Sequence, residues 1–115
     1  IYAMTSAGSS RVWKSYGAVS AAKAALESYC RQLALELAPQ GICCNAILAG
    51  VTDTPALRKI PGNADMIETA IKRSPMGRLT TPDDVAQTMV AFSLPGCSFM
   101  TGNTIRIDGG ENIVD

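Results

Sequence analysis

The chain alternates short apolar runs with longer segments of helical periodicity, and this order predicts an α/β fold. The apolar runs lie near residues 1–6, 42–48 and 104–107 and have the length and composition of buried parallel strands. Apolar residues recur at helical spacing from about 16 to 37, and start and stop signals predict another helix from 82 to 94. Together these segments predict half of a doubly wound parallel sheet.

The first apolar run, Ile1-Tyr2-Ala3-Met4-Thr5-Ser6, ends in small polar residues. That ending is typical of a buried parallel strand whose carboxyl end opens on a binding site. We therefore interpret the segment from Gly8 to Ser15 as an active-site loop.

The segment from Tyr16 to about Leu37 is predicted to be a long helix. Leu26, Leu33 and Leu37 stand at helical spacing, and Pro39-Gln40-Gly41 supplies a stop signal. Small residues that allow close packing on a sheet or a partner helix crowd its first half: Gly17, Ala18, Ser20, Ala21, Ala22, Ala24 and Ala25. The residues from Ile42 to Leu48 follow as the next buried strand.

The region from Val51 to Pro75 has no strand signal and contains Pro55 and Pro61, which predicts a mobile connection with one short helix. Asn63 is the expected N-cap of that helix. Acidic residues near its start and basic residues near its end suit the helix dipole. One face is apolar, formed by Met66, Ile67, Ala70 and Ile71, and suits either a lid or ordinary core packing.

The last helix has the clearest start signal. Thr81 is the expected cap, Pro82 stands at the first helical position and two aspartates follow in the first turn. The helix is expected to run to Leu94, before Pro95-Gly96. The residues from Thr104 to Ile107 form the last predicted strand.

The charge balance argues against a polyanionic partner. The 115 residues include ten basic and ten acidic side chains with no run of like charge. There is thus no electrostatic case for nucleic acid or an anionic membrane, and the expected partner is a small molecule or another protein.

The cysteines predict free thiols rather than a metal site. Cys30, Cys43, Cys44 and Cys97 include no C-x-x-C pair, and the chain has no histidine. Neither a signal peptide nor a long apolar span is recognised. We expect buried free thiols, no metal and a cytoplasmic location.

Tyr16 and Lys23 stand seven residues apart, nearly two helical turns, so they are expected to project from nearly the same face. A phenol with a pKa of about 10 becomes a usable proton donor when a nearby cation stabilises its phenolate. Taken alone, the pair also fits an amphipathic core tyrosine beside a solvated lysine.

Several segments in order resemble the short-chain dehydrogenase/reductase (SDR) family over essentially the whole chain. They are Met4–Ser9, Tyr16–Lys23, Asn45–Thr54, Gly77–Leu79, Pro82–Ala86 and Thr101–Gly110. The resemblance implies the C-terminal half of a Rossmann-type doubly wound parallel sheet. It also implies an NAD(P)-dependent oxidoreductase.

Within that family the commoner members place the tyrosine four residues before the lysine, where this chain has Val19. The seven-residue spacing is similar to that of the enoyl-acyl-carrier-protein reductase III type, whose members act in fatty acid biosynthesis. Ser6, seventeen residues before Lys23, matches the family's serine that helps hold the substrate oxygen. Ala49-Gly50, where many members have Pro-Gly, also fits the enoyl reductase branch.

The resemblance assigns cofactor contacts to Lys23 and to the loop from Gly50 and Val51 to Thr54. Lys23 would bind the nicotinamide ribose, the Thr52 backbone the carboxamide and the Thr54 hydroxyl the pyrophosphate. Taken alone, the threonines also fit turn-forming side chains. Neither NAD nor NADP is favoured, because the discriminating residue lies in the other half of such a fold.

On the substrate side the resemblance makes Tyr16 and Lys23 catalytic. Ser6 is a second hydrogen-bond donor or a strand-end serine bonded to backbone. Trp13 and Ala49 are expected to line the acyl pocket, although a lone Trp can also anchor a loop on the core. The flap over the substrate is assigned to residues 52–75.

No Gly-rich turn joins a first strand to a helix, and such a turn is where this fold binds a pyrophosphate. We therefore expect residues 1–115 to be a partial SDR domain without the N-terminal dinucleotide-binding half.

Three interpretations remain open. The first is a reductase half acting on 2-enoyl thioesters, either small or bound to an acyl carrier. The second is a carbonyl-reducing or alcohol-oxidising enzyme such as a 3-oxoacyl-acyl-carrier-protein reductase. The third is a non-catalytic oligomerisation module, because family members form homodimers or homotetramers through long helices such as 16–37.

Overall fold

The computed structural model describes residues 1–114 and contains a three-stranded, fully parallel sheet. The strands are β1 (Tyr2–Thr5), β2 (Asn45–Ala49) and β3 (Thr104–Ile107), in the order β1-β2-β3. Four residues of the central strand β2 are buried, whereas β1 and β3 are only partly covered. An apolar strand is thus placed where both sheet faces are covered, as in α/β folds.

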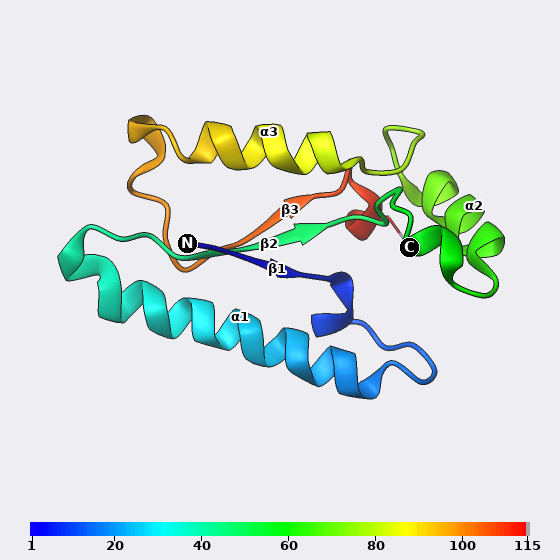
Figure 1. The fold of residues 1–115 in the computed structure, drawn as a ribbon, viewed down its shortest axis with the longest axis horizontal. Helices are drawn as coiled ribbons and strands as arrows, with labels where there is room; N and C mark the ends of the chain where they lie inside the picture. Colours follow the sequence, from blue (N-terminus) through cyan, green and yellow to red (C-terminus); the bar gives the residue numbers. More distant parts are fainter. Residues whose placement is uncertain (115) are drawn as a thin grey trace.

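Two helices cover the two faces of this sheet (Figure 1). One is α1 (Gly17–Leu37) and the other, on the opposite face, is α3 (Pro82–Phe92). A shorter helix, α2 (Asn63–Arg73), lies beyond the carboxyl ends of the strands. This three-layer arrangement of parallel strands between helices confirms the predicted α/β fold class.

The strand register brings all three carboxyl ends to one edge of the sheet. Thr5 is paired with Leu48, and Leu48 with Arg106. The loops that follow the strands therefore begin side by side. In open parallel sheets this edge is where ligands bind.

The start of α1 differs slightly from the prediction. Tyr16 is the N-cap residue, with φ −102° and ψ 3°, and the helix begins at Gly17. At the other end Gly41 adopts a left-handed conformation, φ 72°, which stops the helical segment as predicted. On its inner face Cys30 and Ala34 pack against Cys44 and Ala46 to form the main core.

The predicted N-cap of α2 was wrong. Gly62, with φ 76°, is the capping residue, and Asn63 is the first residue of the helix. The Asn63 side-chain amide donates to the carbonyls of Arg58 and Ile60, at 3.1 and 2.8 Å. Asparagine therefore closes the turn before the helix instead of accepting a hydrogen bond from the helix N-terminus.

The predicted cap of α3 is confirmed. The Thr81 hydroxyl accepts from the Asp84 N–H at 3.2 Å, and the Asp84 carboxylate accepts from the Thr81 N–H at 2.8 Å. This reciprocal pair is a capping box. The helix ends at Phe92, two residues earlier than expected.

The second strand is shorter than predicted and begins at Asn45 instead of Ile42. Cys44 precedes the strand because its N–H bonds to the Thr101 hydroxyl at 3.0 Å.

All four thiols are free, as predicted, but only Cys30 and Cys44 are buried. Burial raises the pKa of the Cys30 thiol to about 11.

None of the helices between residues 1 and 114 combines the length and apolarity that a bilayer span requires.

Candidate functional site

The candidate site begins where β1 ends. Ser6 directly follows the strand, and its hydroxyl oxygen lies 3.4 Å from the hydroxyl oxygen of Tyr16. Both residues are partly buried. The structure thus brings together two of the three predicted catalytic residues, although ten positions separate them in the chain.

Lys23 is tied to the same end of β1. Its Nζ donates to the Met4 carbonyl at 2.9 Å. One helical turn further along α1, Glu27 accepts from the buried Thr5 hydroxyl at 2.7 Å. These two contacts attach the first half of α1 to the residues that immediately precede Ser6.

The backbone before Tyr16 is in an unusual conformation. Ser15 has φ 65°, the single non-glycine residue with positive φ in the described chain. Non-glycine residues rarely adopt the left-handed region, and they are enriched at functional sites when they do. The turn at Ser15 directs the chain from the loop into α1, with the Tyr16 carbonyl accepting from the Ser20 N–H at 2.9 Å.

The Tyr16 ring is positioned by two neighbours in the loop. Trp13 contacts it edge to face, with ring centroids 5.5 Å apart and an interplanar angle of 80°. On another side lies Gly8, which is buried, and a Cβ at that position would overlap the Tyr16 ring. The sequence placed Gly8 at the start of the active-site loop but did not predict this contact. Trp13 itself is half exposed and packs on the tyrosine.

A second loop follows β2 at the same edge of the sheet. The Gly50 N–H donates to the Ile107 carbonyl at 3.1 Å, and the Thr80 N–H donates to the Val51 carbonyl at 3.2 Å. The Asp53 N–H in turn donates to the Thr80 carbonyl at 3.0 Å. Thr52 and Thr80 therefore form an isolated parallel bridge, which fixes the loop backbone. Ala49 is the last residue of β2, where this loop begins.

The bridge leaves the N–H and C=O of one residue, Thr52, turned away from Thr80. Because neighbouring peptide groups of extended backbone alternate in direction, the Thr52 N–H and C=O point to the other side of the bridge. Within residues 1–114 neither group has a hydrogen-bond partner. A partly buried backbone donor and acceptor side by side match a ligand that carries a primary amide.

The side chains of the two loop threonines make turn contacts. The Thr52 hydroxyl donates to the Gly50 carbonyl at 2.8 Å, and the Thr54 hydroxyl oxygen accepts from the Leu57 N–H at 3.2 Å. The Thr54 hydroxyl hydrogen makes no contact within the described chain, so it is available as a donor.

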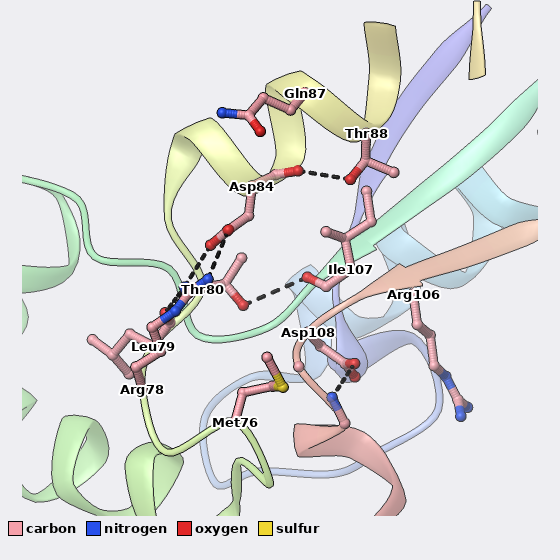
Figure 2. Close-up of a pocket in the computed structure, with 12 residues that line it drawn as sticks. Met76, Arg78, Leu79, Thr80, Asp84, Gln87, Thr88, Arg106, Ile107 and Asp108 are labelled. Atoms are coloured by element: carbon pink, nitrogen blue, oxygen red, sulfur yellow. Dashed lines mark hydrogen bonds and ion pairs between the residues drawn. The ribbon is translucent and has the colours of Figure 1, made fainter. Parts of the chain in front are cut away.

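The pocket drawn in Figure 2, of about 420 Å³, lies elsewhere. Residues of α3, β3 and the adjoining loops line it, and it contains none of Tyr16, Ser6 and Lys23. An ion pair on its wall, Arg78–Asp84, has an N–O distance of 2.7 Å. The Arg78 guanidinium and the Thr81 cap hold the pKa of the Asp84 carboxyl well below its usual range. The pocket adjoins α3, on the sheet face opposite α1, and shares Thr80 with the bridge to Thr52.

Other acidic and sulfur groups do not form a metal centre in the part of the chain that the structure describes. No group of three or more His, Cys, Asp or Glu side chains is close enough to bind an ion there.

The comparisons with known proteins agree on one protein family. Residues 1–112 match the family model described as enoyl-(acyl carrier protein) reductase. The chain is 35% identical over 117 aligned residues to a 1-cyclohexenylcarbonyl-CoA reductase from Streptomyces collinus, covering 99% of this chain and 41% of that protein. The chain therefore spans about two fifths of the length of this curated relative.

Solved structures agree. An enoyl-acyl carrier protein reductase from Bacillus cereus, with NADP+ and an indole naphthyridinone, superposes with a TM-score of 0.91 at 32% identity, over 99% of this chain and 44% of that one. A 3-ketoacyl-(acyl-carrier-protein) reductase from Brucella melitensis, complexed with NADH, gives 0.83 at 31% identity, over 96% and 43%. The structural neighbours of the present chain are Rossmann-fold enzymes. The chain belongs to the short-chain dehydrogenase/reductase family, within the group described by the enoyl-(acyl carrier protein) reductase model.

Proposed function

We propose that residues 1–115 form the catalytic and substrate-binding half of an NAD(P)H-dependent oxidoreductase that reduces 2-enoyl thioesters. The observation that carries this proposal is the Ser6–Tyr16 hydroxyl pair, 3.4 Å apart, at the carboxyl edge of a parallel sheet. The Lys23 side chain donates a hydrogen bond to the carbonyl of Met4, two residues before that serine. Two hydroxyl donors and a cation in this arrangement suit the stabilisation of a developing oxyanion.

In this mechanism the Tyr16 hydroxyl donates a hydrogen bond to the thioester carbonyl of the substrate. A bound reduced nicotinamide would supply the hydride, which adds to the β carbon. Negative charge then collects on the enolate oxygen, where the Tyr16 and Ser6 hydroxyls stabilise it. Tyr16 gives its proton to this oxygen, and the resulting enol tautomerises to the saturated thioester. We assign Lys23, on the helix that follows Tyr16, the role of stabilising the negative charge that forms during this proton transfer.

The residues of the second loop fit the cofactor's nicotinamide end. The carboxamide has both a donor and an acceptor, which match the unpaired Thr52 C=O and N–H. The Thr54 hydroxyl hydrogen would reach a pyrophosphate oxygen. Lys23 Nζ uses one of its three donors on Met4, leaving two for ribose hydroxyls. We leave NAD and NADP as equal candidates.

On the substrate side we propose that Trp13 and Ala49 line the acyl pocket and that residues 52–75 act as a flap. Part of the apolar face of α2 is uncovered, which supports a covering role: Met66 and Ile71 are 44% and 38% exposed, whereas Ala70 is buried. A helix that only packed on the core would bury them. Leu35, an apolar side chain of α1 that is 72% exposed, likewise supports assembly of the complete enzyme as a homo-oligomer.

Carbonyl reduction is the second candidate, and the similarity to the Brucella melitensis 3-ketoacyl reductase favours it. The same hydroxyl pair would serve, because in both reactions charge develops on a carbonyl oxygen.

The test uses the full-length protein that contains this sequence. Oxidation of NADH and of NADPH is followed by absorbance with a 2-enoyl thioester and with the matching 3-keto thioester at equal concentrations. We expect faster oxidation with the enoyl substrate. A clear preference for the keto substrate would move the assignment to carbonyl reduction, and no turnover of either would favour the non-catalytic oligomerisation module.

A further inference from the structure

Glu111 makes an unanticipated contact with the loop after β2. It is the first residue of the 3₁₀ turn Glu111–Ile113, which follows β3. Its Oε2 accepts a hydrogen bond from the Val51 N–H at 2.8 Å, across 60 positions of sequence. A carboxylate acceptor makes this bond stronger than a neutral one.

The turn that presents Glu111 is itself fixed by the buried Asp108. The Asp108 carboxylate accepts from the Gly110 N–H at 3.0 Å and from the Asn112 side-chain amide at 2.8 Å. The Glu111 N–H donates to the Asp108 carbonyl at 3.0 Å. From α2, Arg73 donates to the Val114 carbonyl at 2.7 Å. The backbone on both sides of Glu111 is therefore held in place.

The carboxylate also packs tightly against Gly50. A Cβ at position 50 would lie 2.7 Å from Glu111 Oε2 and 2.7 Å from Thr80 Oγ1. Such distances are below normal van der Waals separation, so a side chain at position 50 would displace the Glu111 carboxylate or the Thr80 hydroxyl. The loop is thus clamped, with Glu111 holding the Val51 N–H and Thr80 holding the Val51 carbonyl.

This clamp bears directly on Thr52. With both polar groups of Val51 and the Asp53 N–H occupied, the peptide groups around Thr52 have one orientation, in which its own N–H and C=O face away from Thr80. We infer that Glu111 is a positioning residue that presets the Thr52 backbone for the nicotinamide carboxamide. The inference rests on the proposed function, because that function makes Thr52 a cofactor contact.

The inference predicts that binding depends on the reach of residue 111 more than on its charge. In the full-length protein, Glu111→Gln keeps an acceptor oxygen at the same distance, whereas Glu111→Asp keeps the charge but is one methylene shorter. Glu111→Ala removes both. Asp83→Asn, at an exposed position on α3, is the matched control for loss of one negative charge.

Dissociation constants for NAD(H) and NADP(H) are measured by titration calorimetry, and exchange of the Val51 and Thr52 amides by hydrogen–deuterium exchange. For the better-bound cofactor, we expect Glu111→Ala and Glu111→Asp to raise Kd about tenfold, the scale of a lost hydrogen bond to a charged group. Glu111→Gln and Asp83→Asn are expected to stay within about threefold of the unsubstituted protein. Amide exchange at Val51 should accelerate only in the Ala and Asp variants.

Two results separate the inference from the proposal on which it rests. If the unsubstituted protein binds a dinucleotide and Glu111→Asp binds it equally well with unchanged Val51 exchange, the positioning role is wrong. If the unsubstituted protein binds none, the proposed function fails and the inference fails with it. Should Glu111→Ala not fold, the comparison of the Gln and Asp variants decides the matter.

Discussion

At the scale of single residues, the candidate site depends on small neighbours as much as on the groups that would perform chemistry. Tyr16 lies after the left-handed Ser15, its ring contacts Trp13, and no side chain at Gly8 displaces it. These contacts leave the ring little freedom. A positioned donor contributes to catalysis only if it stays where charge develops, so this packing is part of the site.

Gly8→Ala should therefore lower activity without removing any polar group. The new methyl would overlap the Tyr16 ring and displace its hydroxyl from Ser6. A displacement on the order of 1 Å costs up to about a hundredfold in rate. The measurement is kcat of the full-length enzyme.

Gly17→Ala is the matched control, since nothing lies within 4 Å of a Cβ there. That variant should keep its activity, and its helix should be slightly more stable, because alanine is the better helix former. Equal kcat values for the two variants would show that Gly8 does not constrain Tyr16.

The residues that sequence could predict are those with a recognisable type and spacing. Tyr16, Lys23 and Ser6 were predicted in this way, and the structure places them around one strand end. Gly8, Glu27 and Glu111 were missed, because their contacts span 8, 22 and 60 positions and depend on the folded chain. The catalytic roles of Tyr16, Lys23 and Ser6 are proposals.

At the scale of elements, α1 is joined to β1 by polar contacts as well as by its apolar face. Thr5 is only 6% exposed and its hydroxyl donates to Glu27, while Lys23 bonds to the Met4 carbonyl one turn earlier. Buried hydroxyls need a partner because an unsatisfied one loses its solvation. The strand end that precedes Ser6 is thereby fixed to the helix that follows Tyr16.

Glu27→Ala is expected to reduce the free energy of unfolding by about 1 to 3 kcal/mol, because it leaves the Thr5 hydroxyl buried without its acceptor. Glu27→Gln, which keeps an acceptor, should lose less. The measurement is urea-induced unfolding of the full-length protein.

Glu36→Ala on the same helix is the control, since its bond to Gln32 at 2.6 Å is exposed. That variant should change stability by less than about 0.5 kcal/mol. If the Glu27 and Glu36 variants were equally stable, the Thr5–Glu27 contact would not join the two elements.

Element types were predictable, whereas their ends were less so. The capping box at Thr81 acts within four consecutive residues, and its sequence signature identified it. The cap of α2 was wrong because Asn63 donates to the preceding turn, a choice that depends on Gly62 taking the left-handed conformation. The second strand begins late because Thr101, 57 positions away, takes the Cys44 N–H.

At the scale of the whole molecule, the parallel order β1-β2-β3 gathers the groups that matter at one edge. Ser6 follows β1, the Gly50–Thr54 loop follows β2, and the Glu111 turn follows β3. Alternating strands and helices predicted this arrangement, since parallel strands share one direction. The pocket between α3 and β3 was not predicted; it contains none of Ser6, Tyr16 and Lys23, although Thr80, which pairs with Thr52, lines it.

We propose that Tyr16 is the hydrogen-bond and proton donor of the reaction, and the turnover of Tyr16→Phe in the full-length enzyme tests this role most directly. Phenylalanine keeps the ring and its packing on Trp13, so only the hydroxyl is lost. Tyr29→Phe, on an exposed face of the same helix, is the matched control. We predict a fall in kcat of about a hundredfold or more for Tyr16→Phe and no change for Tyr29→Phe. Nearly full activity of Tyr16→Phe with an unchanged pH profile would mean that another group is the proton donor.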